Sequence, residues 1–262
     1  MQSDTRWLLR GTAAAALLLL ACAIAWTLDT RTLNGVSVWS KPLKFNLSFA
    51  LHLLTLAWLI RHMAPVSRSG GWALLAVRTV VIATLIELLY ISFQAARGRQ
   101  SHFNFETQWE TAAYYALMGG AALAVVFATA VLGWLLWRHP RAGLAAGVHW
   151  GAALGLMVGS IATLVTAGAL ASGAVAGPVH WVGGVHSDAA GLPLFGWSST
   201  GGDLRVPHFF ATHLTQALPL AGWLAGGLPW ARASVATAAL LGIGVVVLTF
   251  SQALAGRAFI PL

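Results

Sequence analysis

Charged residues are scarce in this sequence. Only 8% of its 262 residues are Asp, Glu, Lys or Arg, whereas 58% are hydrophobic. A soluble domain contains about 25% charged residues, so this chain has too few polar side chains to cover the surface of a soluble globule. This scarcity excludes an ordinary soluble domain and indicates a protein of the lipid bilayer.

Several chemical signatures are also absent. Cys22 is the one cysteine, which excludes an intrachain disulfide and any CxxC metal or redox motif. The sequence contains no GxSxG, no HExxH and no GxGxxG that follows a strand-like run, so no catalytic signature identifies an enzyme. The last apolar run has no lysine, which excludes a retinal Schiff base in that segment. Whether the protein is an enzyme is left open.

The charge balance is strongly basic, with fifteen Lys and Arg against seven Asp and Glu. The basic residues are scattered through short loops and form no run with interleaved aromatic residues, so nucleic acid is excluded as a partner. In a membrane protein such loops contact anionic lipid headgroups. The expected partners are the lipid bilayer and either a small-molecule ligand or another membrane protein.

Seven apolar segments are present, and each is long enough for the roughly 20 residues of a membrane helix. They predict an all-α, polytopic transmembrane bundle that forms a single integral membrane domain over residues 1–262. Many of the thirteen Trp lie near the ends of these segments, as in an aromatic belt at the membrane surface. The predicted helices cover residues 7–27, 43–63, 71–95, 109–137, 143–175, 207–229 and 232–256.

Alternation of the seven helices places the loops at 28–42, 96–108 and 176–206 on one face of the membrane. These loops are longer than the others and hold most of the carboxylates, whereas the opposite face has short basic connections. The basic connections favour a cytoplasmic N-terminus, although Lys and Arg are almost equally divided between the faces. The loop at 176–206 is predicted to be a lid that folds back on the mouth of the bundle.

Polar residues follow one face of two predicted helices. Lys44 and His52 lie on one face of the second helix, and Glu87 and Gln94 on one face of the third. These faces should turn into the bundle, since a carboxylate that faces lipid costs about 2.5 kcal/mol or more. Glu87 must therefore be protonated, paired or next to a wet cavity, and its candidate partners are Arg97, Lys44 and His52.

The fifth and sixth segments predict a close helix pair. Glycine recurs at every fourth position of the fifth segment, and such a strip lets another helix approach backbone to backbone. In the sixth segment, Asp203 is a candidate N-cap, and Pro219 predicts a bend or break. The glycines of the strip are Gly143, Gly147, Gly151, Gly155 and Gly159.

The histidines of the sixth segment have three open interpretations. His208 and His213 diverge by about 140° on a helix, so they are poor joint ligands for one metal ion. Either one can ligate a haem or a metal with a partner on another helix, such as His52 or His102. The other interpretations are hydrogen bonding to carbonyl groups, which would rigidify the mouth, and proton handling.

Two stretches, WSKPLKF at 39–45 and GWSSTGGDLRVPHF at 196–209, resemble motifs of uncharacterised bacterial multi-pass inner-membrane proteins. The resemblance implies a compact helical bundle in the bacterial inner (cytoplasmic) membrane, and it implies no catalytic role.

These patterns together predict an outward-facing polar pocket that binds a cofactor, either haem or a metal ion, or a small ligand. A transporter of a small solute and an accessory or sensor protein are the alternatives. The predicted ligand-binding residues are Lys44, Glu87, Gln94, Asp203, Arg205 and Gln216, and the candidate metal or haem ligands are His52, His102, His208 and His213.

Overall fold

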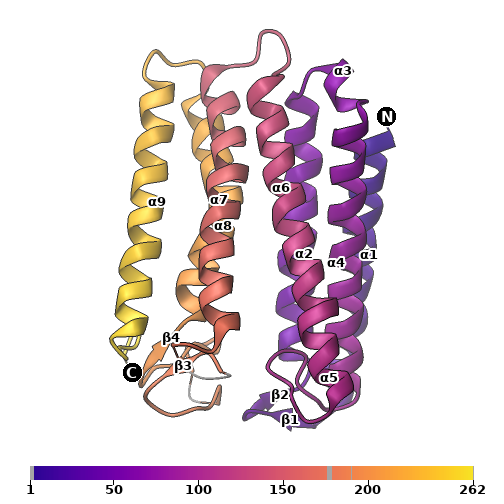
Figure 1. Cartoon of the computed structure of the whole chain (residues 1–262), viewed down its shortest axis with the longest axis vertical. Helices are drawn as coiled ribbons and strands as arrows, with labels where there is room; N and C mark the ends of the chain where they lie inside the picture. The colour runs from indigo at the N-terminus through magenta and orange to yellow at the C-terminus, as the bar shows by residue number, and fades with distance from the viewer. Residues whose placement is uncertain (1–2, 176–178, 190, 262) are drawn as a thin grey trace. The chain divides into compact units, whose positions relative to one another are not determined.

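The computed structural model describes residues 3–175, 179–189 and 191–261 (Figure 1). It is 71% helical, and the strands in these ranges are four pieces of two residues each. The all-α prediction is therefore confirmed. Six of the described helices are long and apolar enough to cross a membrane, as judged by their length and composition. The chain is a multi-pass membrane protein.

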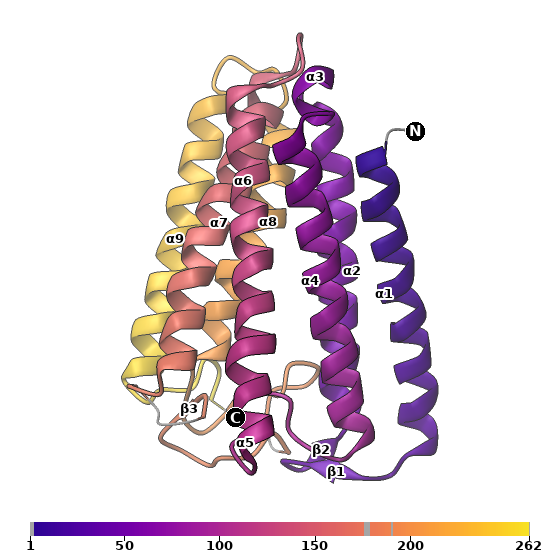
Figure 2. The same ribbon diagram turned by 45° about the vertical axis from the view of Figure 1, so that its right-hand side comes forward.

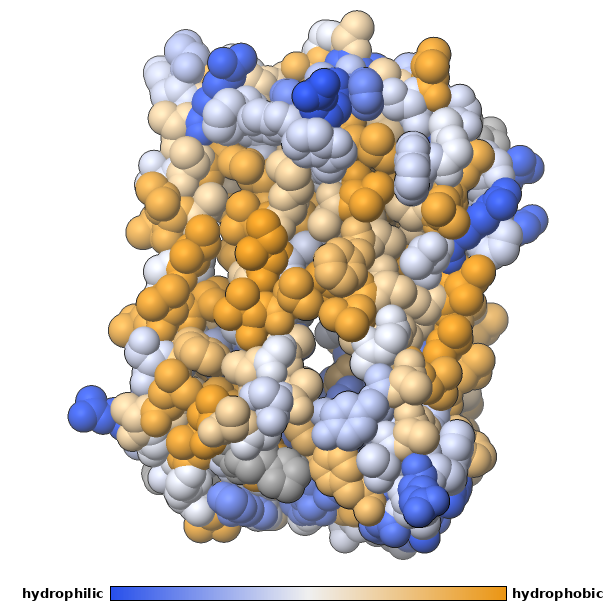
Figure 3. All heavy atoms as spheres, viewed as in Figure 1, coloured by the Kyte–Doolittle hydropathy of each residue, from blue (hydrophilic) through white to orange (hydrophobic). Residues whose placement is uncertain are grey.

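Large apolar side chains on the outside of the helices explain this assignment. Leu17 and Leu20 of the first helix are 68% and 58% exposed, and Leu240 and Leu241 of the last are 70% and 66% exposed. Figure 3 shows apolar residues along the middle of the helices and polar residues gathered at their ends. Lipid tails stabilise such a surface, and a helix suits it because its backbone hydrogen bonds are all internal.

The chain divides into two compact units. Unit 1 comprises Met1–Leu33 and Ser37–Ala145, and unit 2 comprises Asn34–Val36 and Ala146–Leu262. Each unit is described by itself, and the single domain over residues 1–262 stays a prediction.

Unit 1 contains the first four predicted membrane segments, each within a few residues of its expected bounds. The helix that starts at Gln108 changes to a π-helix, η2, and continues as α6. Helix α1 packs on α2 and α4, and α4 packs on α2 and α6 (Figure 2). The helices are α1 (Ser3–Leu28), α2 (Ser40–Leu59), the 3-10 helix η1 (Ile60–His62), α3 (Pro65–Arg68), α4 (Gly71–Ala96), α5 (Gln108–Ala112), η2 (Ala113–Gly119) and α6 (Gly120–Arg138). The two-residue strands β1 (Thr32–Leu33) and β2 (Val36–Ser37) follow α1, and Val36 of β2 is assigned to unit 2.

Two apolar clusters hold α4 against its neighbours. In the first, Ala83 of α4 packs with Ala121 and Val125 of α6 and with Phe49 of α2. The second lies nearer the end of α4 and contains Tyr90, Ile91, Ala113, Met118 and Phe45. The buried positions of α4 therefore face two different helices, and Thr84, Glu87 and Leu88 are buried between the clusters.

Unit 2 is built on three packed helices. They correspond to the last three predicted segments, and their bounds differ from the predicted ones by at most four residues. Between α7 and α8, strands β3 and β4 pair antiparallel, with Trp181 opposite Asp203 and Val182 opposite Gly202. The elements are α7 (Ala146–Ser172), β3 (Trp181–Val182), β4 (Gly202–Asp203), α8 (Arg205–Ala225) and α9 (Ala231–Leu254).

The glycine strip of α7 is the contact surface for α8. A Cβ atom at Gly147 would lie 2.4 Å from the carbonyl oxygen of Gly222, and one at Gly151 would lie 2.6 Å from that of Leu218. These distances are far inside van der Waals contact, so a side chain at either position would force the helices apart. The predicted close pair is confirmed for four of the five glycines, because Gly155 and Gly159 make similar contacts, while Gly143 precedes α7 with a φ of +74°.

The same contacts show that α8 runs antiparallel to α7. Gly147 faces Gly222, whereas Gly159 faces Thr215. Helix α8 has 21 residues, or about 31 Å of helix, but it is not among the six apolar helices. It follows α7 for most of its length, and with the six apolar helices it gives about seven long helices, in agreement with the predicted number.

Helix α8 does not break at Pro219. It continues through this residue to Ala225, so the prediction of a helix break at Pro219 is wrong. The Pro219 ring packs against the glycine strip of α7, since a Cβ atom at Gly155 would lie 2.4 Å from Pro219 Cδ. Neighbouring helices commonly make a proline tolerable inside a membrane helix.

Substitution of Gly155 tests this packing. We expect Gly155→Ala to lower the melting temperature of the purified protein in detergent, because overpacking a tight contact costs about 1–3 kcal/mol. Gly168→Ala is the matched control, since a Cβ atom at Gly168 would meet no atom within 4 Å. Equal melting temperatures for the two variants would contradict the close α7–α8 contact.

Candidate functional site

The predicted site residues fall into two groups, one in each unit. Unit 1 holds Lys44, His52, Glu87, Gln94 and His102, and unit 2 holds Asp203, Arg205, His208, His213 and Gln216. A single pocket that draws on both groups stays a prediction.

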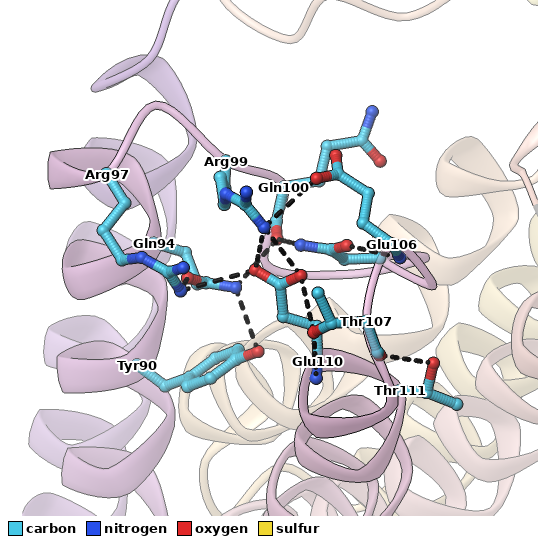
Figure 4. A network of polar contacts seen from close by, with 10 residues as sticks. Tyr90, Gln94, Arg97, Arg99, Gln100, Glu106, Thr107, Glu110 and Thr111 are labelled. Atoms are coloured by element: carbon cyan, nitrogen blue, oxygen red, sulfur yellow. Dashed lines mark hydrogen bonds and ion pairs between the residues drawn. The ribbon is translucent and has the colours of Figure 1, made fainter.

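A buried ion-pair network closes the loop between α4 and α5 in unit 1. The carboxylate of Glu110 is 0% exposed and accepts hydrogen bonds from Arg99 Nη1 at 2.7 and 2.8 Å (Figure 4). Arg97 Nη1 lies 3.4 Å from the same carboxylate. The hydrogen bonds to Glu110 raise the pKa of Arg99 above its usual value. Two guanidinium groups thus share one buried carboxylate.

Local sequence explains why Glu110 lies there. Thr107 is the N-cap of α5, and its Oγ1 accepts a hydrogen bond from the backbone N–H of Glu110 at 3.1 Å. The same hydroxyl donates to the Glu110 carboxylate at 3.0 Å. A Thr followed three residues later by Glu is the pattern of a capping box. Glu110 was missing from the predicted site, and this pattern was the signal that marks its position.

Gln94 belongs to this network. It is fully buried, and its Nε2 donates to Tyr90 Oη at 3.2 Å and to the carbonyl of Gln100 at 3.3 Å. Its Oε1 accepts from Arg97 Nη1 at 2.8 Å (Figure 4). Gln94 therefore fixes the loop to the end of α4.

Glu87 lies deeper in unit 1, nine residues before the end of α4, or about 13 Å. It is 4% exposed, and within the described residues its Oε1 has no hydrogen-bond partner. The same holds for Oγ1 of Thr84, one turn away on the same face, and for Oδ1 of Asn46 on α2. Three buried oxygen atoms of unit 1 thus lack a protein donor in the part of the chain that the structure describes.

The cation that acts electrostatically on Glu87 is Lys41, in the first turn of α2. Arg97, one of the partners expected for Glu87, contacts Gln94 and Glu110 instead, so that expectation is wrong. His52 Nε2 lies 3.1 Å from Thr129 Oγ1 of α6. Lys44 is half-buried on α2.

His102 lies among aromatic rings of unit 1. Its ring centroid is 5.7 Å from that of Phe45 on α2 and 6.0 Å from that of Tyr114 in η2. Its Nδ1 is 3.1 Å from Ser101 Oγ. The loop residue His102 therefore joins α2 to the π-helix, an element that frequently marks functional sites.

Arg205 is the centre of a second ion-pair network, in unit 2. Its Nη2 lies 2.6 Å from Asp203 Oδ2 and 2.9 Å from Asp188 Oδ1, and it donates to the carbonyl of Gly196 at 2.7 Å. Asp203 also accepts the backbone N–H groups of Ser198 and Arg205 at 3.0 and 2.9 Å. The network ties the loop before α8 to the start of that helix.

Asp203 does not cap α8 as predicted. The N-cap residue is Leu204, which has no side-chain cap, and Asp203 lies in β4. The carboxylate still satisfies one backbone donor of the first turn, so its role is close to that of a cap.

The two histidines of α8 have protein partners. His208 Nδ1 lies 3.1 Å from Thr166 Oγ1 on α7. His213 Nδ1 lies 2.8 Å from the carbonyl of Phe209, and the two rings are 4.0 Å apart. Gln216 Oε1 accepts a hydrogen bond from Thr215 Oγ1 at 2.9 Å. These contacts favour hydrogen-bonding roles for both histidines.

Candidate metal ligands do not gather in the described part of the chain. There, no group of three or more His, Cys, Asp or Glu side chains is placed to hold a metal ion. His52 and His102 belong to unit 1, and His208 and His213 belong to unit 2. A metal site on these four histidines stays a prediction without a ligand cluster to support it.

The loop at 176–206 is folded through a tight turn. Leu192 N–H donates to the carbonyl of Trp197 at 2.8 Å, and Trp197 stacks on Phe195 with ring centroids 4.3 Å apart. Trp197 also meets Phe209 of α8 edge-on at 5.2 Å. Residues 176–178 and 190 lie outside the described residues. The role of this loop as a lid stays a prediction.

No protein-family model, curated protein or solved structure matches this chain.

Removal of the Glu110 charge tests the first network. We expect Glu110→Gln to release the loop and to increase the rate of trypsin cleavage after Arg97 and Arg99, since trypsin requires an accessible, flexible segment. Glu106→Gln is the control, because the Glu106 side chain is 62% exposed and contacts Arg99 alone among these arginines. Cleavage of Glu110→Gln at the same rate as the unmodified protein would show that the network does not hold the loop.

Proposed function

We propose that this protein binds a small polar solute inside unit 1, with Glu87 as the binding carboxylate. One observation carries the proposal: Glu87 Oε1 is buried in a membrane-spanning helix and has no hydrogen-bond partner in the described residues. An unsatisfied buried polar group costs about 1–3 kcal/mol, and ionisable residues inside membrane helices are rare outside functional sites. A bound solute would supply the missing donor.

The neighbouring oxygens support the chemical class of this solute. Glu87 and Asn46 offer oxygen acceptors, and Thr84 offers a hydroxyl. Lys41, in the first turn of α2, acts electrostatically on Glu87. A small amine, amide or polyol, which presents N–H or O–H donors, fits these groups.

A polar stripe supports an access route. Glu87, Tyr90 and Gln94 follow one another at spacings of three and four on α4 and share one side of the helix. Gln94 contacts Arg97 at the helix end. A polar solute that enters from the loop between α4 and α5 would therefore meet hydrogen-bonding groups along its path.

Transport of the same solute is the second candidate function. It is favoured by the position of Glu87, about 13 Å inside a helix that spans the membrane. We infer further that the protein lies in a bacterial inner membrane with its N-terminus in the cytoplasm, which would open the polar stripe to the outside. The basic short connections between helices support this orientation.

Thermal stabilisation tests the binding proposal. We expect at least one member of a panel of small amines, amides and polyols to raise the melting temperature of the purified protein, because a ligand at 100 times its Kd stabilises the native state by about 2.7 kcal/mol. Glu87→Gln should abolish the effect, and Gly168→Ala, in unit 2, should retain it. Stabilisation that survives in Glu87→Gln would place the binding site elsewhere.

The absorption spectrum and the metal content of the same preparation test the cofactor alternative. A Soret band or a stoichiometric metal would replace the proposed solute by haem or a metal ion.

Single-cysteine labelling tests the orientation. In a Cys22→Ala background, Val185→Cys in the long loop should react with a membrane-impermeant maleimide in intact spheroplasts. Val66→Cys should react only after the membrane is opened. Both positions are well exposed, at 59% and 84%, so accessibility within the protein is matched. The reverse pattern would invert the topology.

A further inference from the structure

The surface of unit 1 has a hollow that the Glu87 region does not use. Its volume is about 460 Å³, and it opens outward between the loop before α5 and the first turn of η2. Two aromatic rings, a carboxylate and two hydroxyl groups line it, from Phe105, Tyr115, Glu106, Thr107 and Thr111. This combination of side chains is unusual for a surface that faces only lipid tails.

The hollow lies beside the ends of two candidate membrane spans, where lipid headgroups are expected. The membrane-spanning segment Gln108–Arg138 begins at its wall, and the segment Gly71–Ala96 ends immediately before Arg97. Tyr115, Trp109 and Phe105 are 57%, 55% and 40% exposed, as expected of aromatic residues at a membrane interface. A molecule in the hollow would be a headgroup or a solute of that layer.

One side of the hollow suits an ammonium group. The rings of Phe105 and Tyr115 are 6.0 Å apart with an angle of 33° between their planes, and the Glu106 side chain beside them is 62% exposed. Aromatic faces attract cations, and a carboxylate accepts hydrogen bonds from N–H groups.

The adjacent side suits a phosphate. The side chains of Arg97 and Arg99 are 34% and 35% exposed, and together they share the single buried carboxylate of Glu110. Glu106 balances the remaining positive charge of these three groups, so the four side chains together carry no net charge, as does a zwitterionic headgroup. Arg99 Nη1 lies 3.1 Å from Glu106 Oε2 (Figure 4), so a positive and a negative group lie side by side, and Arg binds phosphate well.

We propose that this hollow binds the headgroup of a phospholipid that carries a primary ammonium group, as in an ethanolamine phospholipid. The ammonium contacts Glu106 beside the two rings, and the phosphate contacts Arg99. A primary ammonium donates hydrogen bonds to Glu106, whereas a choline headgroup has no N–H and a glycerol headgroup has no positive charge. This proposal is independent of the solute site at Glu87.

Lipid retention tests the proposal. The full chain is purified in detergent with equal amounts of ethanolamine, choline and glycerol phospholipids, and the bound lipids are counted by native mass spectrometry. We expect the ethanolamine lipid to be retained preferentially, and Glu106→Gln and Tyr115→Ala each to reduce this preference by about threefold. Phe127→Ala is the control for lost aromatic surface, because Phe127 is 57% exposed on α6 of the same long helix.

Four outcomes would overturn it. Equal retention of ethanolamine and choline lipids would show that Glu106 does not select the ammonium group. Preferential retention of the glycerol lipid would show that the arginines alone bind an anionic headgroup. An unchanged preference in Glu106→Gln and Tyr115→Ala would place the lipid elsewhere. Binding of water-soluble phosphoethanolamine in lipid-free detergent to the same extent as the ethanolamine lipid would show a headgroup site that does not require a lipid. A charge reversal, Glu106→Lys, should shift retention towards the glycerol lipid if the proposal holds.

Discussion

The structure depends on one constraint: inside a bilayer, a polar group must find its partner within the protein. Two ion-pair networks in the described residues meet it. The Glu110 carboxylate is shared by Arg97 and Arg99, and Arg205 lies between Asp203 and Asp188. Glu87 is one of the exceptions, because its Oε1, like Thr84 Oγ1 and Asn46 Oδ1, is buried without a hydrogen-bond partner in the described residues.

Helix packing in unit 2 meets a second demand of the membrane. Lipid tails are as apolar as leucine, so helices associate through close packing and hydrogen bonds rather than through the hydrophobic effect. The glycines of α7 admit the backbone of α8 at Gly222 and the ring of Pro219. This contact also positions Thr166 of α7 against His208 of α8, which explains why a histidine is tolerated there.

The loop between α4 and α5 links the two proposed binding regions of unit 1. On its inner side, Arg97 contacts Gln94, the last residue of the polar stripe that leads to Glu87. On its outer side, Arg99 contacts Glu106 at the hollow. Both arginines are held by Glu110, which Thr107 positions at the start of α5. A single buried carboxylate therefore orients both the route to the interior and the rim of the interfacial hollow.

Hydropathy alone determined the helices, because each crossing needs a long apolar run, and the spacing of Gly147 to Gly159 determined the contact face of α7. The pattern Thr107-x-x-Glu110 is also readable in the sequence. Only the tertiary structure decided the partners: Arg97 contacts Glu110, Lys41 acts electrostatically on Glu87, and α8 continues through Pro219. The physical reason is that spacing fixes which residues share a helix face, whereas the helix that this face meets depends on packing between segments far apart in the chain.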